Sequence, residues 1–339
     1  MFRSALLAPG ALLALAAIGF AAPAAAQTQA RVGYIPVIGA SQIFVAEKEG
    51  LTKAAGLDVK FITFESGPAM IQALASGTLD VYVAGVAPLA VARSKGVDVK
   101  VIAATAIDEM TTIVGVKLAP FFKDGVAPAQ ALKDFKAATG KAARFATQPP
   151  GSVPHTTLAH WLAEVAKADR ADYEIVTMGI DATQQALLAG AVDGSTLREP
   201  AVTVSMLREP KLKLVATGSQ MFPNQPGTVV AISGAFAAKN AEAVQKLMNG
   251  VVEATRIIQK EPQRAAGPIE AALGKGLVDR ATIEKALASP ASKFASDPSA
   301  IIASFKAMQA YQVKIGSLDK ELPLDGLFDA SYYEKAMRK

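Results

Sequence analysis

The residues that could do chemistry in this 339-residue chain are polar side chains and glycines in turns that precede helices. Such turns lie at residues 38–42, 66–68, 85–88, 151–155, 181 and 198–200. The first backbone N–H groups of a helix have no partner within the helix, and the helix dipole favours negative charge beside them. Hydrogen-bond acceptors and anions bind well at such turns, so the sequence predicts ligand binding there.

No pattern typical of catalysis or metal binding accompanies these turns. His155 and His160 are five residues apart and do not share a helix face, and the chain has no cysteine to complete a zinc site. The sequence contains no HExxH run, phosphate-binding loop or Ser-His-Asp arrangement. We expect no catalytic residue, no metal and no cofactor. The lack of cysteine also excludes disulfide bonds and a lipid-modified N-terminal cysteine.

The N-terminal segment 1–26 is typical of a cleavable secretory signal peptide. Arg3 is followed by an apolar run over 5–22, and the segment ends in the small residues Ala24 to Ala26. The alternative is an uncleaved anchor, for which a run interrupted by proline and glycine is marginal. No later segment is long and apolar enough to span a bilayer. We therefore expect a periplasmic protein that is not embedded in the membrane.

The net charge of +5 is spread along the chain without a basic run or interleaved aromatic side chains. The electrostatic field of such a surface is too weak to indicate nucleic-acid binding. An anionic solute is compatible with this charge, and a surface of solvated lysines explains the charge equally well.

Short β-rich runs alternate with helical runs, and this order positions the turns. Strands are expected at 31–35, 57–64, 79–84, 99–104, 143–147, 173–178 and 192–197, and helices at 41–49, 66–77, 88–96, 156–168 and 182–188. Helices of this length between strands require parallel pairing through right-handed crossovers. The fold class is therefore α/β. The turns then lie at the carboxyl ends of strands, where open parallel sheets bind their ligands.

One stretch of the chain recurs downstream. Gln72-Ala73-Leu74 followed by Gly77 and Asp80 returns as Gln185-Ala186-Leu187 followed by Gly190 and Asp193, with every position displaced by 113 residues. We interpret this match as two similar βαβ units, and hence two similar lobes, against the alternative of chance among alanine-rich helices. The chain is also longer than one typical core of about 100 to 200 residues.

The chain is expected to cross between the lobes near 106–116 and near 219–228, after which a strand at 229–233 returns to the first lobe. The remainder is predicted to be helical, with a helix over 241–260, a stop at Pro262, and further helices after Asp279, Asp297 and Asp329. The predicted organisation is a signal peptide at 1–26, lobe I at 27–110 and 225–339, and lobe II at 111–224.

Seven segments together carry a resemblance to a known family. They are RVGYIP, FESGPAMIQALASGTLDV, GVAP, GSVPH, GIDATQQALLAGAVDG, REPAV and FDASYYEKAM, in this order over nearly the whole mature chain. The chain resembles the nitrate, taurine and alkanesulfonate (NitT/TauT) solute-binding proteins of ABC importers, in a group that includes thiamine-pyrimidine synthase-like domains. This resemblance implies a two-lobed periplasmic-binding-protein (type II) fold, with mainly parallel sheets flanked by helices and a ligand cleft between the lobes.

The resemblance also implies which turns contact the solute. Ser66 and Gly67 match a turn that donates hydrogen bonds, and Ser152, with its neighbours, matches another. Val86 stands where family members often have a polar residue, which weakens the case for a sulfonate-type site. The predicted ligand-binding residues are Ile38, Gly39, Ser41, Ser66, Gly67, Val86, Ala87, Ser152, Val153, His155, Asp181, Arg198, Glu199 and Asn224.

Several of these residues have a purely structural alternative. Ser66 and Asp181 could cap helices, and His155 could be a capping or surface imidazole. Arg198 could bind a carboxylate, sulfonate or phosphate through two hydrogen bonds, or it could form a salt bridge between the lobes.

The function implied by the resemblance is that of the binding component of an ABC importer. A monomer would close its lobes on a small organic anion, such as a sulfonate or carboxylate, or on a heterocycle, and deliver it to permease and ATPase subunits. One alternative is a periplasmic receptor that senses the solute for a signalling partner. The other is an enzyme on the same fold, which is disfavoured because the synthase relatives rely on a cysteine-rich motif and this chain has no cysteine.

Overall fold

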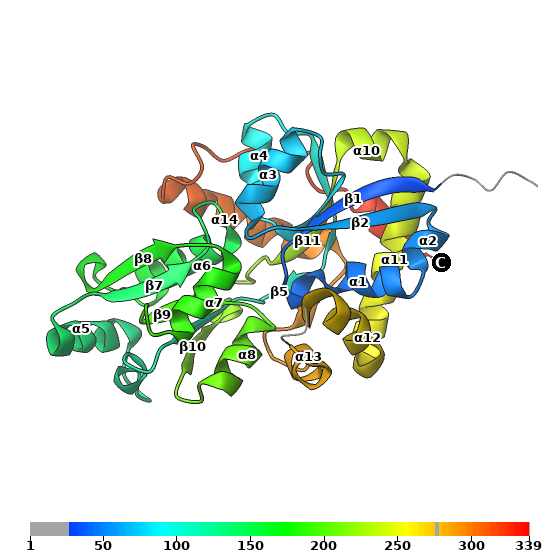
Figure 1. Cartoon of the computed structure of the whole chain (residues 1–339). Coiled ribbons are helices and arrows are strands. Elements are labelled where there is room, and N and C mark those ends of the chain that lie inside the picture. Colours follow the sequence, from blue (N-terminus) through cyan, green and yellow to red (C-terminus); the bar gives the residue numbers. More distant parts are fainter. Residues whose placement is uncertain (1–26, 275–277, 339) are drawn as a thin grey trace, which may run out of the picture.

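The structure is a computed structural model that describes residues 27–274 and 278–338 (Figure 1). The predicted signal peptide lies outside the described residues. Two five-stranded sheets, each flanked by helices, form two lobes. Lobe I contains the sheet ordered β2-β1-β3-β11-β4, and lobe II contains the sheet ordered β10-β6-β9-β7-β8. The predicted α/β class is confirmed.

The sheet of lobe I is mixed, with one strand that arrives late in the chain. Its strands are β1 (Thr28–Tyr34), β2 (Leu57–Thr63), β3 (Val81–Gly85), β4 (Val99–Ala104) and β11 (Thr228–Ser233). β1 pairs in parallel with β2 and β3, as the intervening helices require. β11 lies antiparallel between β3 and β4, which agrees with the strand predicted to return to the first lobe.

The sheet of lobe II has the same parallel centre with two antiparallel additions. Its strands are β6 (Thr111–Val114), β7 (Ala143–Thr147), β8 (Tyr173–Thr177), β9 (Gly194–Leu197) and β10 (Lys213–Thr217). β7 pairs in parallel with β8 and β9, whereas β6 lies antiparallel between β9 and β10. A separate two-stranded sheet joins β5 (Ala106–Ile107) to β12 (Lys293–Phe294).

Helices cover the sheets, and their apolar faces form the cores. In order they are α1 (Ser41–Lys48), α2 (Leu51–Ala54), α3 (Gly67–Ala75), α4 (Pro88–Ser94), α5 (Pro128–Thr139), α6 (Val153–His160), α7 (Ile180–Leu188), α8 (Ala201–Arg208), α9 (Gly218–Met221), α10 (Gly234–Lys239), α11 (Ala241–Lys260), α12 (Pro262–Ile269), α13 (Arg280–Leu287), α14 (Ile302–Lys314) and α15 (Ser331–Met337). α11 is the longest of these, and its buried stripe of Val244, Leu247, Val251 and Ile258 shows the helical spacing expected of a core-facing helix.

Three local predictions differ from the structure. β6 and β10 depart from the expectation, which has a chain crossing at 106–116 and no element at 213–217. The helix predicted over 241–260 is confirmed with these bounds, but α12 is an additional helix, and Pro262 opens it at a position where the missing N–H costs no hydrogen bond. α6 begins at Val153, before the predicted residue 156, because Ser152 caps it and Pro154 occupies its first turn.

The 113-residue repeat is a structural repeat. The backbone N–H of Arg31 donates to the Asp80 carboxylate at 2.9 Å, and Arg144 donates to Asp193 in the same way at 2.9 Å. The register repeats as well, since Val32 of β1 pairs with Val81, and Phe145 of β7 pairs with its counterpart in β9. The alternative of chance similarity is wrong, and the two βαβ units are equivalent.

The two chain crossings are fastened to each other between the sheets. Asp108 N–H donates to the carbonyl of Gln225, and Gln225 N–H donates back to Asp108 Oδ1, both at 2.9 Å. The Gln225 side chain accepts from Met110 N–H at 3.0 Å, and Lys293 Nζ lies 2.9 Å from Asp108 Oδ2. The predicted boundaries at 110/111 and 224/225 fall beside this junction; the division into those residue ranges stays a prediction.

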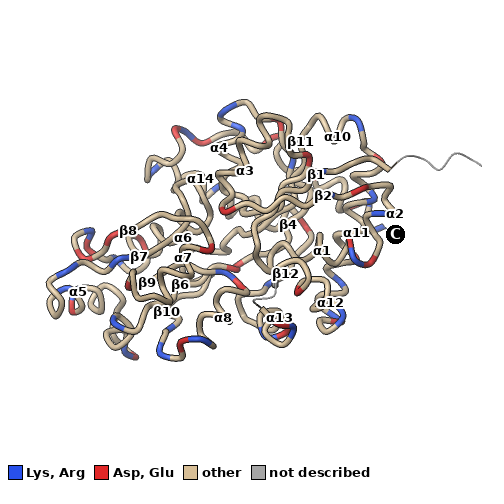
Figure 2. Tube along the Cα trace, in the orientation of Figure 1, with Lys and Arg blue, Asp and Glu red and all other residues tan. Residues whose placement is uncertain are grey.

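Charged residues of both signs are mixed over both lobes (Figure 2). Lysine and arginine do not gather on one element but are interspersed with aspartate and glutamate along the chain. Over the described residues, this distribution forms no extended basic stripe of the kind that tracks a nucleic-acid backbone.

Candidate functional site

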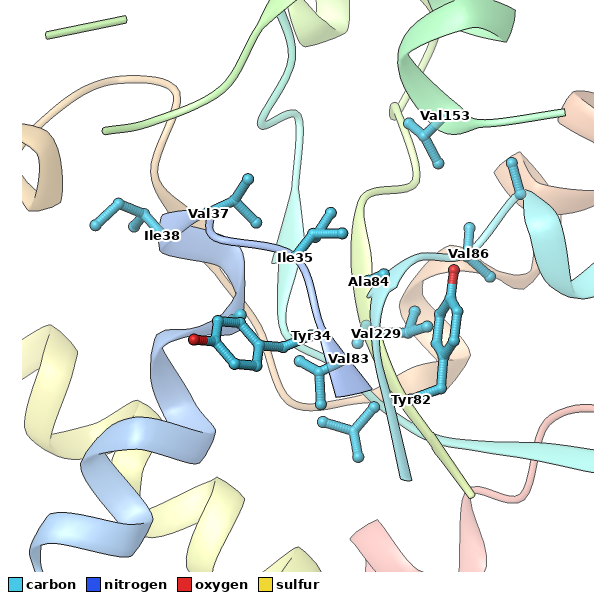
Figure 3. Close-up of a cluster of buried hydrophobic side chains, with 14 of the residues drawn as sticks. Tyr34, Ile35, Val37, Ile38, Tyr82, Val83, Ala84, Val86, Val153 and Val229 are labelled. Atoms are coloured by element: carbon cyan, nitrogen blue, oxygen red, sulfur yellow. The ribbon is translucent and has the colours of Figure 1, made fainter. Parts of the chain in front are cut away.

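The turns at the carboxyl ends of the strands face each other across the boundary between the lobes. Ile38 N–H in lobe I donates to the carbonyl of Glu199 in lobe II at 2.8 Å, and Ile180 N–H in lobe II donates to the carbonyl of Glu65 in lobe I at 3.1 Å. Val153 at the start of α6 points toward the lobe I segment that carries Val86 (Figure 3).

The packing at this boundary is close enough to need glycine. A Cβ added at Gly85 would lie 2.7 Å from Val153 Cγ2, which is too close for any side chain. Gly151, in the turn on the other side of the boundary, has a φ of 82°, which favours glycine. The repeat relates the pair of turns 85–88 and 151–155 to the pair that contains Ile38 and Glu199, because adding 113 to 38 gives 151, and subtracting 113 from 199 gives 86. The two lobes therefore meet through equivalent pairs of turns, and the structure has the arrangement of a closed clamp.

A buried ion pair lies at the centre of this boundary. Arg198 Nη1 lies 3.1 Å from Glu109 Oε1, and the two side chains are only 2% and 4% exposed. Thr228 Oγ1 donates to the same Glu109 oxygen at 2.7 Å. Gly39 adjoins the other carboxylate oxygen so closely that a Cβ there would have no room. The pair thus ties the end of β9 in lobe II to the first chain crossing.

A cavity of about 180 Å³ opens beside this pair, between lobe I and helices α7 and α8 of lobe II. Arg198 and Asp181 are the members of the predicted set that line it. Gln184 adds an amide, and Val37 and Val204 are among its apolar walls. A mostly apolar hollow with a few polar groups is the usual form of a small-molecule site.

Ser66 and Ser152 are buried N-caps. Ser66 Oγ accepts from Ala69 N–H at 3.4 Å, and Ser152 Oγ accepts from His155 N–H at 3.3 Å. In the structure Ser66 therefore caps helix α3, as the structural alternative for this residue predicts. Both turns lie at the lobe boundary, and neither serine is among the residues that line the cavity.

The other predicted residues are distributed over different surroundings. Buried residues at the lobe boundary are Ile38, Gly39, Ser41, Gly67, Val86, Ala87 and Val153. Asn224 is exposed at the second crossing, with φ of 47°. Asp181 is exposed in the first turn of α7, whose N-cap is Gly179, so the alternative that Asp181 caps this helix is wrong.

Burial shifts the pKa of two of the predicted residues, Glu199 and His155. Burial raises the pKa of the Glu199 carboxyl, although hydrogen bonds from Ser289 and from Thr203 oppose the shift. Burial lowers the pKa of His155, which lines a different hollow together with Tyr173 and Tyr311. The structure does not bring His155 to the interlobe cavity.

Sequence reasoning missed Glu109 and Thr228, which complete the buried cluster around Arg198. The available signal was a pair of acidic residues, Asp108 and Glu109, within an otherwise apolar crossing segment. Nearby, the Ser41 hydroxyl and the Gln42 amide oxygen are buried without a hydrogen-bond partner among the described residues. Unpaired buried polar groups are costly, so this region is suited to a bound molecule or ordered water.

The described part of the chain shows neither a metal-binding cluster nor a membrane-spanning helix. No group of three or more acidic, histidine or cysteine side chains is placed to hold a metal ion. Among the same residues, no helix combines the length and the apolar character needed to cross a bilayer.

Comparison with known proteins places the chain in a family. Residues 23–271 match the NMT1-like family. The chain belongs to this family. As a member, it is 25% identical over 246 residues to the nitrate import ATP-binding protein NrtC of Synechococcus elongatus, a match that covers 72% of this chain and 37% of that protein. The chain thus corresponds to a minor part of that longer relative.

Solved structures share the fold of this NMT1-like protein. The periplasmic nitrate-binding protein NrtA from Synechocystis PCC 6803 has a TM-score of 0.77 at 15% identity, over 92% of this chain and 89% of that one. The alkanesulfonate-binding protein SsuA from Xanthomonas axonopodis pv. citri, bound to MOPS, has a TM-score of 0.72 at 21% identity, over 90% and 100%. The predicted two-lobed periplasmic-binding-protein fold is confirmed.

Proposed function

We propose that this NMT1-like protein is the periplasmic solute-binding component of an ABC importer. The observation that carries the proposal is that turns at the carboxyl ends of the strands meet across the lobe boundary, with Ile38 hydrogen-bonded to Glu199 and Ile180 hydrogen-bonded to Glu65. Such contacts fit a clamp whose lobes separate to admit a solute and close around it. Family membership and the shared fold support the same function.

The closed form would be selected by a solute that contacts both lobes at once. A ligand shifts an equilibrium only as far as its affinities for the two states differ, and contacts to both lobes exist only when the clamp is closed. The junction of Asp108 and Gln225 joins the two crossings, where a small change of backbone angles would move one lobe against the other. The proposed lobes are 27–110 with 225–339, and 111–224.

The proposed solute site is the cavity beside Arg198. Of the predicted residues, Arg198 and Asp181 would contact the solute, because they line the cavity. Ser66 and Ser152 would act indirectly, by fixing the N-terminal ends of helices α3 and α6 at the lobe boundary. The protein would be exported by a signal peptide, segment 1–26, that is then cleaved. It would bind the solute without catalysis and deliver it to permease and ATPase subunits.

A thermal-shift screen of residues 27–339 tests this function. The panel contains sulfonates, carboxylates, amides, pyrimidines and flavins. One class is expected to raise the melting temperature, because a ligand at one hundred times its Kd stabilises the folded state by about 2.7 kcal/mol. Arg198→Gln should reduce the rise, whereas Lys133→Gln, the same kind of change at an exposed position of α5 outside the cavity, should leave it unchanged. A panel without any shift would count against a solute-binding role.

A further inference from the structure

Arg198, the one buried cation among the described residues of the proposed site, is already neutralised by the protein. Arg198 lines the interlobe cavity, and Glu109 stands against it at 3.1 Å. Glu109 in turn accepts from Thr228 at 2.7 Å, which fixes the carboxylate in this position. This inference rests on the proposed function, because it concerns the solute that the same cavity would hold.

The remaining described walls of the cavity add no net charge. Asp181 and Arg208 are both exposed and carry opposite charges. Gln184 and Gln185 are uncharged amides, and the other described lining residues are apolar. An anion in this cavity would give up its hydration next to a guanidinium that already faces a carboxylate, and the described walls hold no unbalanced positive charge that would offset that cost.

We propose that the solute is an uncharged molecule with an apolar body, about the size of one ring, and with a hydrogen-bond acceptor that meets Arg198. The Arg198–Glu109 pair uses one guanidinium nitrogen, Nη1, among the described contacts. A guanidinium has five N–H donors, so others remain to bind a carbonyl or ring nitrogen. A neutral acceptor gains these bonds without placing a second negative charge beside Glu109.

The volume of the cavity supports the proposed size. It measures about 180 Å³, and a cavity of about 150 Å³ in another protein holds benzene. Pockets for drug-sized ligands are larger, at about 300–1,000 Å³. The solved relatives are named for nitrate and alkanesulfonate, which are anions. The proposed solute therefore differs from theirs in charge.

A matched series of three compounds tests the charge preference of the unaltered protein. Benzamide, benzoate and benzamidine have nearly the same shape but are neutral, anionic and cationic at pH 7. We expect benzamide to bind at least about tenfold more tightly than benzoate or benzamidine in calorimetric or thermal-shift titrations. Equal or tighter binding of either charged compound would overturn the proposal. So would the absence of binding by all three at about 10 mM, a concentration suited to ligands of so few atoms.

The variant Glu109→Gln should change the charge preference of the cavity. The variant removes the counter-charge of Arg198, so benzoate should gain at least about tenfold in affinity relative to the unaltered protein. Asp181→Asn is the matched control, since it removes one negative charge from the cavity wall but leaves Arg198 paired. A similar gain in both variants, or in neither, would contradict a specific role for Glu109.

These outcomes separate this inference from the proposed function. Breaking a buried ion pair is strongly destabilising, so the three-compound series on the unaltered protein stands as a test that does not depend on the variant folding. A protein that binds an anionic sulfonate or carboxylate of the screening panel most tightly would retain its solute-binding role, and the neutral-solute inference alone would fall.

Discussion

At the level of single residues, Ser152 shows how a predicted ligand contact can be a helix cap. Its Oγ accepts from His155 N–H at 3.3 Å, and the residue is 1% exposed. Ser152→Ala should lower the free energy of unfolding by about 1 kcal/mol in urea titrations, because the cap is lost. The ligand-induced rise in melting temperature should stay the same. Ser152→Asp, which can also cap, is the control; a smaller ligand-induced rise in Ser152→Ala alone would instead indicate contact with the solute.

His155 should make the stability of the protein depend on pH. Burial lowers its pKa in the folded state below its ordinary value of 6.5, so the unfolded chain takes up a proton first as the pH falls. Stability is therefore full above about pH 6.5 and declines as the pH drops through the lower folded pKa. Denaturant titrations between about pH 7.5 and 5 should show this decline, and His155→Gln should weaken it. Parallel curves for the two proteins would show that His155 does not contribute.

The sequence was least informative about which side chains contact each other at the site. Arg198 was identified from its place before a proline at a strand end, and the structure places it in the cavity. Its partner Glu109 lies 89 positions earlier in the chain. No local pattern links two such residues, because their contact depends on how the lobes are closed. Ser66 was recognisable because capping depends on neighbouring residues alone.

At the level of elements, each βαβ unit has an aspartate that accepts a hydrogen bond from the backbone of an arginine in its first strand, but the side-chain bonds of the two pairs differ. Asp80 accepts from Arg31 N–H and from its Nε and Nη2 at 2.8 to 2.9 Å. Asp193 accepts from the Arg144 backbone, whereas the Arg144 side chain bonds to the Ala191 carbonyl.

Matched substitutions should reveal this difference. Asp80→Asn is expected to cost about 1–2 kcal/mol of unfolding free energy, because it weakens a forked, charge-assisted set of bonds that is partly exposed. Asp193→Asn should cost less than about 1 kcal/mol. Urea titrations of the two variants provide the comparison, and an equal or larger loss for Asp193→Asn would refute the ranking.

The parallel elements could be predicted, whereas the antiparallel additions could not. Strands such as β7 and β8 follow helices at regular spacing, and their predicted bounds agree with the structure to within one residue. β6 has only four residues and follows directly on a chain crossing. It becomes a strand because β9 and β10 pair with it on either side. Tertiary pairing of this kind outweighs local sequence preference.

At the level of the whole molecule, the repeat predicted two similar lobes but not how they meet. The displacement of 113 residues indicates equivalent turns, such as those that contain Ile38 and Gly151. Which turn of one lobe faces which turn of the other depends on both chain crossings. The structure supplies that information through the bonds between Asp108 and Gln225.

The most direct test of the account is a covalent lock across the lobes. Glu65 and Gly179 face each other, and a Cβ added at Gly179 would lie 3.3 Å from Glu65 Cβ, close to the separation of about 3.5–4.5 Å in disulfides. The chain has no cysteine of its own, so the variant Glu65→Cys/Gly179→Cys can form only this bond.

The measurement is the rate at which the locked protein exchanges the panel compound that gives the largest thermal shift. Uptake and release should be at least about tenfold slower in the oxidised double variant than in the same protein reduced, because the clamp must open for exchange. Single-cysteine variants, which cannot lock, serve as controls. Equal rates in the oxidised and reduced proteins would contradict the account.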